Sequence, residues 1–96
     1  MEDRAAVEDI EFLRSRIEEL DSGILRLLGE RFAHVRLLGR WNARAEPERD
    51  AELRALYLHA AQREGLDPLL VLRVFDAVQE HSRAVLGGEV RRPLTA

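Results

Sequence analysis

The sequence predicts an all-α fold, a three-helix protomer with a long first helix, and three features support this prediction. No proline interrupts residues 8–42, where apolar side chains recur at alternating intervals of three and four, the spacing of one helix face. Pro47 and Pro68 each follow an acidic residue, an arrangement typical of a helix start. Gly65 and the glycines at 87–88 stand where the apolar patterns end, as helix stops commonly do.

The first helix is expected over residues 8–42, with Asp3 or Asp9 as a candidate cap. Its apolar seam consists of Ile10, Leu13, Ile17, Leu20, Ile24 and Leu27. A helix of about 35 residues extends for roughly 50 Å, which exceeds the diameter of a compact monomer of this size. We therefore expect the first helix to project onto another chain.

The second helix is expected from Pro47 to about Arg63, and the third from Pro68 to the glycines at 87–88. The second helix directs one apolar set to the core, namely Leu53, Leu56, Tyr57, Ala60 and Ala61. The third helix carries an apolar stripe made of Leu70, Val71, Val74, Phe75, Val78 and Val85. We expect one domain over residues 8–86, an N-terminal tail over 1–7 and a flexible C-terminal tail over 87–96.

Composition narrows the classes of function. The net charge of −3 gives no general attraction to nucleic acid, and no run approaches the roughly 18 apolar residues of a membrane span. Neither partner is expected. The absence of cysteine removes thiolate metal sites and fits a cytoplasmic location. All 15 basic residues are arginine, so the chain has no lysine for catalysis, and the three histidines show no metal-ligand spacing.

Arg31 places a charge where the seam of the first helix calls for an aliphatic side chain. One interpretation is that it reaches solvent or pairs with Glu30 or Glu52. The other is that it faces a cavity that receives an anion, because a buried guanidinium needs a negative partner. Asn42 lies eleven residues on, about 20° from the same helix face. The two side chains are thus candidates to donate to one ligand.

Three further polar positions have both a structural and a functional interpretation. Ser82 stands four residues after Val78 in the apolar stripe, where a serine usually bonds its own upstream carbonyl. Arg49 and Asp50 lie in the first turn of the second helix, where acidic residues already favour the helix dipole. Arg14 lies at the edge of the seam, where a surface role is the simplest interpretation.

Taken together, these residues resemble the all-helical chorismate mutase family (chorismate mutase type II) over roughly residues 8 to 86. The order of several short segments carries the resemblance. They are Leu13-Arg14-Ser15-Arg16-Ile17-Glu18-Glu19-Leu20-Asp21, Leu27-Leu28-Gly29-Glu30-Arg31, Pro47-Glu48-Arg49-Asp50, the Gly65 to Pro68 turn, and Phe75 followed by Ser82.

The resemblance implies an intertwined homodimer of three-helix protomers in which each active site borrows an arginine from the partner. It also implies the isomerisation of chorismate, a small dicarboxylate, to prephenate in the shikimate pathway of aromatic amino-acid biosynthesis. This pericyclic reaction uses no cofactor and no metal. Catalysis would come from holding the reactive conformer and from stabilising charge on the ether oxygen. An activating partner enzyme is a further expectation, because some small family members have one.

The resemblance also assigns the site residues. Arg14 would reach into the partner's site, and Arg31 and Arg49 would hold carboxylates. Asp50 would accept the ring hydroxyl, and Ser82 would contact the substrate from the third helix. The complete set has catalytic roles for Arg31, Asn42 and Asp50, and substrate contacts for Arg14, Arg31, Asn42, Glu46, Arg49, Asp50, Ser82 and Leu86.

Two of these positions depart from the family pattern. Asn42 aligns with a family lysine and Leu86 with a family glutamine, both donors to the ether oxygen, and leucine donates nothing. Losing one such donor costs about 2.7 to 4 kcal/mol. Three hypotheses remain: a chorismate mutase with a modified, weaker site; a mutase or lyase for 4-amino-4-deoxychorismate or isochorismate in secondary metabolism; or a non-catalytic homologue that binds a ligand or dimerises.

Overall fold

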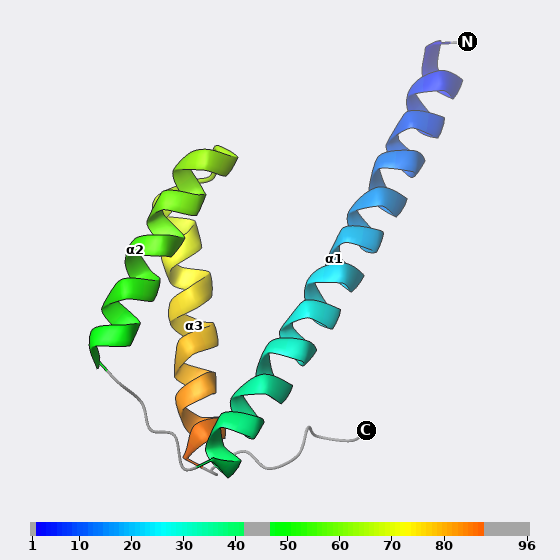
Figure 1. The fold of residues 1–96 in the computed structure, drawn as a ribbon. Helices are drawn as coiled ribbons and strands as arrows, with labels where there is room; N and C mark the ends of the chain where they lie inside the picture. Colours follow the sequence, from blue (N-terminus) through cyan, green and yellow to red (C-terminus); the bar gives the residue numbers. More distant parts are fainter. Residues whose placement is uncertain (1, 42–46, 88–96) are drawn as a thin grey trace. The chain divides into compact units, whose positions relative to one another are not determined.

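The computed structural model describes residues 2–41 and 47–87, and within these ranges the chain is helical without strands. The helices are α1 (Glu2–Arg40), α2 (Pro47–Glu64) and α3 (Pro68–Leu86), in chain order as Figure 1 shows. The predicted all-α, three-helix protomer is confirmed. Asn42 and Glu46 lie outside the described residues, as does most of the C-terminal tail.

α1 begins earlier than the apolar pattern indicated, at Glu2 rather than Glu8, and it ends at Arg40 rather than Asn42. The added residues 2–7 carry no apolar repeat, but they include glutamate, arginine and two alanines, which are good helix formers. At the other end, the Trp41 amide donates to the Leu38 carbonyl at 3.1 Å. This bond over three residues tightens the last turn and closes the helix.

The chain divides into two compact units, Met1–Ala33 and His34–Ala96. The first unit consists of the greater part of α1. Its seam lies on the surface of the single chain, with side chains 46% to 57% exposed. A stripe of six half-exposed aliphatic residues along one helix is an apolar face that the described part of the chain leaves open.

In the second unit α2 and α3 lie side by side, joined by a short turn (Figure 1). Gly65 adopts φ +68°, a left-handed conformation that glycine accepts without the steric cost of a Cβ. The Leu66 amide donates to the Ala61 carbonyl at 2.8 Å, which caps the end of α2. Asp67 then accepts from the Leu69 amide at 3.0 Å, and Pro68 opens α3. These residues act as the sequence predicted.

The buried core of the second unit is small. Its members are 1% to 8% exposed and come from facing sides of α2 and α3: Ala61, Val71, Val78, Ser82 and Val85. Beside them the rings of Tyr57 and Phe75 stack with centroids 4.1 Å apart. A side chain added at Gly39, in the last turn of α1, would meet the Leu86 carbonyl at 3.5 Å. The end of α1 therefore approaches the end of α3 closely.

Several residues expected in the core are exposed instead. Leu56 is 57% exposed, Leu70 53% and Val74 49%. A pair of helices shares only one mutual face, so apolar side chains beside that face find no cover within this unit. The second unit therefore presents open apolar surface, as the seam of α1 does.

Candidate functional site

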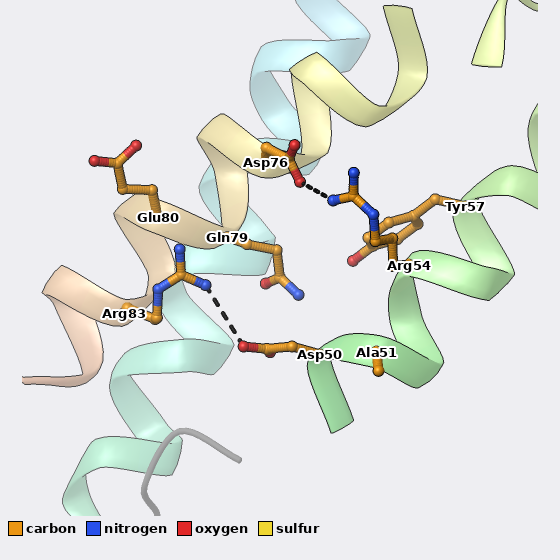
Figure 2. Close-up of a pocket in the computed structure, with 8 residues that line it drawn as sticks. All are labelled: Asp50, Ala51, Arg54, Tyr57, Asp76, Gln79, Glu80 and Arg83. Atoms are coloured by element: carbon orange, nitrogen blue, oxygen red, sulfur yellow. Dashed lines mark hydrogen bonds and ion pairs between the residues drawn. The ribbon is translucent and has the colours of Figure 1, made fainter. Parts of the chain in front are cut away.

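A cleft of about 370 Å³ opens between α2 and α3 within the second unit. Figure 2 shows the side chains that line it. The α2 wall is formed by Asp50, Ala51, Arg54 and Tyr57, and the α3 wall by Asp76, Gln79, Glu80 and Arg83. On each helix the members are mostly three or four residues apart, so each wall is one helix face.

Two ion pairs cross the cleft. Arg54 Nη1 lies 2.7 Å from Asp76 Oδ1, within the range of a charge-assisted hydrogen bond. Arg83 Nη1 lies 3.5 Å from Asp50 Oδ2, which is longer than a good hydrogen bond. All four side chains are 40% to 59% exposed, and pairs this open typically contribute about 0 to 1 kcal/mol. The pairs arrange charge around the cleft more than they stabilise the fold.

The charges around the cleft do not balance. The lining includes three carboxylates, those of Asp50, Asp76 and Glu80, and two guanidinium groups, and Glu80 extends from α3 away from α2 (Figure 2). Gln79 extends from α3 between the two ion pairs (Figure 2) and adds a neutral amide. The aromatic stack holds Tyr57 against Phe75 and so fixes one side of the α2 wall. The cleft therefore offers donors, acceptors and an aromatic ring to a small polar ligand.

Asp50 is the predicted site residue that lines this cleft. Its neighbour Arg49 is 60% exposed and donates to Glu52 at 3.2 Å. Arg49 is not among the residues that line the cleft. The substrate-binding role of Arg49 remains a prediction.

Ser82 and Leu86 lie on the packed side of α3 rather than among the residues that line the cleft. Ser82 is 8% exposed, and its hydroxyl donates to the Val78 carbonyl at 2.8 Å. This is the local bond that the structural interpretation predicted. Leu86 is half-buried near Gly39. Substrate contacts for both remain predictions.

The other predicted residues lie elsewhere in the chain. Arg14, exposed, and Arg31, half-buried, belong to the first unit. Asn42 and Glu46 lie outside the described residues. The roles of these four residues remain predictions.

Most of the residues that line the cleft, including Arg54, Asp76, Gln79 and Arg83, were not predicted from the sequence. A signal was present, because four polar residues, at positions 76, 79, 80 and 83, share one face of the third helix, opposite the apolar stripe. Such a polar face usually indicates no more than a solvated helix surface. The cross-helix pairs depend on the register of α2 against α3, which no local pattern reveals.

Two further kinds of feature are absent from residues 2–41 and 47–87. No helix there is long and apolar enough to cross a membrane. Within the same ranges, no three histidine, aspartate or glutamate side chains gather as a metal ion would require.

Comparison with known proteins completes the description of the site. No curated protein and no solved structure matches the chain significantly. The sequence model of one family does match: chorismate mutase type II, over residues 13–86. This range runs from the seam of α1 through the cleft to the end of α3, and it covers more than half of the chain. The chain therefore belongs to the chorismate mutase type II family.

Proposed function

We propose that the protein isomerises chorismate to prephenate. The observation that carries the proposal is the family match over residues 13–86. It is supported by a cleft that is lined by Asp50, the residue expected to accept a hydrogen bond from the ring hydroxyl. In this reaction one C–O bond breaks as one C–C bond forms within the same molecule. The protein has to hold the compact conformer and to stabilise negative charge on the departing ether oxygen.

The arginines are suited to holding the substrate. A guanidinium presents planar pairs of N–H groups that match a carboxylate, and chorismate carries two carboxylates. In this proposal Arg31 and Arg49 bind them within one protomer, and Arg14 contributes from the partner. Asp50 accepts the hydroxyl and so fixes the ring.

A homodimer is part of the proposal. Six aliphatic side chains of the α1 seam are 46% to 57% exposed in the single chain. Burying the remaining half of each would contribute on the order of 1 kcal/mol per side chain. Two copies of the seam would then offset a cost of association of about 4 to 15 kcal/mol. A second copy of α1 is the natural cover, because an isologous contact presents the same seam from both sides.

We expect weak catalysis by the isolated protein, because two positions lack the donors that the family has at the ether oxygen. Asn42 and Leu86 replace the lysine and glutamine expected at the ether oxygen, and only Asn42 can donate. Each lost donor is worth about 2.7 to 4 kcal/mol, or roughly 10² to 10³ in rate. An activating partner enzyme would be one way to restore the rate. We place the activity in the cytoplasm, in aromatic amino-acid biosynthesis.

One observation favours a second candidate substrate, 4-amino-4-deoxychorismate. The cleft carries three carboxylates and two guanidinium groups, an excess that suits a ligand with an ammonium group where chorismate has a hydroxyl. Asp50 would then form an ion pair with the ammonium group instead of accepting a hydrogen bond from the hydroxyl. The two substrates differ at that position alone, so they can be compared directly.

The test uses purified protein with each substrate, beside the Asn42→Lys variant. Formation of prephenate above the uncatalysed rate supports the proposal, and a faster Asn42→Lys variant assigns the deficit to the missing donor. Preferential turnover of the amino analogue favours the second candidate. If neither compound is converted or raises the melting temperature, both functions are refuted.

A further inference from the structure

The arginines that face the α2–α3 cleft differ in how firmly they are held. Arg54 donates to Asp76 at 2.7 Å, a short bond that a ligand would have to break. Arg83 stands 3.5 Å from Asp50, too far for a strong hydrogen bond. A guanidinium has five N–H donors in a planar fork, and this contact engages few of them. Arg83 can therefore turn toward a ligand anion at little cost.

On α3, Ser82 and Leu86, the two residues predicted to contact the substrate, do not line this cleft. Ser82 donates its hydroxyl proton to the Val78 carbonyl at 2.8 Å and is 8% exposed. Leu86 has no side-chain donor. Arg83 and Gln79, one turn apart, project from α3 toward α2 (Figure 2) and line the cleft with Asp50. The donors that α3 directs into this cleft thus come from the Gln79 and Arg83 face.

We propose that Arg83 is a substrate-binding residue whose guanidinium exchanges its loose contact with Asp50 for an anionic oxygen of the substrate. The inference rests on the proposed function, and it deepens it by naming a donor that the family comparison did not assign. Asp50 is the resting counter-ion of Arg83. When the substrate enters, the guanidinium of Arg83 donates hydrogen bonds to its anionic oxygen. The Asp50 carboxylate then becomes available to accept a hydrogen bond from the hydroxyl or ammonium group of the ring.

This exchange has an electrostatic basis. Among the residues that line the cleft, Arg54 alone would oppose the carboxylates of Asp50, Asp76 and Glu80 if Arg83 were removed, and Arg54 is already bonded to Asp76. Such a cleft would repel a dicarboxylate. Arg83 supplies the positive charge on the α3 side, and its side chain, half exposed, can reach a ligand without leaving a buried position.

The experiment measures kcat and KM with chorismate and with its amino analogue for the wild type, Arg83→Met, Arg83→Lys and Arg73→Met. Arg73 is the matched control, because it is an exposed arginine on α3 outside the residues that line the cleft. We expect Arg83→Met to lower kcat/KM by about 10- to 100-fold, the range for a hydrogen bond from a charged donor. Arg83→Lys should recover part of the loss, since it keeps the charge without the fork. Arg73→Met should match the wild type.

Two controls keep the outcomes distinct. Circular dichroism checks folding, and Arg83→Gln replaces Arg83→Met if the latter unfolds. The Arg83→Met change is also made in Asp50→Asn, and ligand binding is followed by the shift in melting temperature. A further loss of binding in that background supports direct contact. No further loss shows that Arg83 acts only through Asp50, which overturns the proposal.

If the wild type is active and the kcat/KM of Arg83→Met lies within twofold of that of Arg73→Met, the inference is also overturned, while the proposed function stands. A wild type that neither converts nor binds either compound overturns the proposed function and this inference together. The two failures are therefore separable by the behaviour of the wild type.

Discussion

Leu20→Asp is expected to separate the protomers, because Leu20 lies near the middle of the α1 seam. Its side chain is 53% exposed in the single chain, so about half of a burial worth roughly 1.5 to 3 kcal/mol remains to be gained in a dimer. Aspartate forfeits that gain and places an unpaired charge in an apolar contact, at a cost of about 3 to 5 kcal/mol. A symmetric dimer carries the change twice. The dimer should weaken by at least about 6 kcal/mol, or roughly 10⁴-fold in Kd.

The assay is analytical ultracentrifugation over a range of protein concentrations. The wild type should sediment with twice the 11.0 kDa mass of one chain, and Leu20→Asp as a monomer at micromolar concentration. Ser22→Asp is the control, since an exposed residue two positions on lies about 160° away around the helix and should leave the dimer intact. A Leu20→Asp variant that dimerises like the wild type would refute the seam as the interface, and a monodisperse wild-type monomer would refute the dimer itself.

Four further substitutions test the turn, a glycine of α1 and the cleft. Gly65→Ala should destabilise the fold by about 1 to 2 kcal/mol, because a Cβ disfavours φ +68°. Gly29→Ala, in open space on α1, should instead stabilise the fold by up to about 1 kcal/mol. Equal effects of the two substitutions on the free energy of unfolding in urea would contradict this. Asp67→Ala removes the bond to the Leu69 amide and should cost about 1 kcal/mol in the same measurement, so an unchanged midpoint would show that the cap is dispensable. Asp50→Asn should change stability by less than about 1 kcal/mol, because its ion pair is half exposed, yet lower turnover of chorismate at least tenfold; unaltered kinetics would remove Asp50 from the site.

The helix boundaries show what the sequence can predict. Gly65, Asp67 and Pro68 specify the turn through local chemistry alone, so α3 begins where expected, and Gly87 caps its end where the glycines at 87–88 predicted a stop. The end of α2 at Glu64 differs from the expected Arg63 by one residue. The start of α1 was placed too late, because residues 2–7 favour a helix by propensity without any apolar repeat.

The cleft shows what local patterns leave out. Arg54 and Asp76 are 22 residues apart, and their pairing follows from how two helices pack rather than from either helix. Asp50 was identified through the family resemblance, whereas its partner Arg83 required the register of α2 against α3. Leu56 and Leu70 were expected in the core because they are apolar, but both are exposed beside the face that α2 and α3 share.

The most direct measurement of the central claim is the conversion of chorismate by the purified wild-type protein, followed by nuclear magnetic resonance. The proposed function predicts that prephenate appears in equimolar amount as chorismate disappears, at a rate proportional to protein concentration and above the uncatalysed background. Chorismate that decays only at the background rate, at every protein concentration tested, would contradict it.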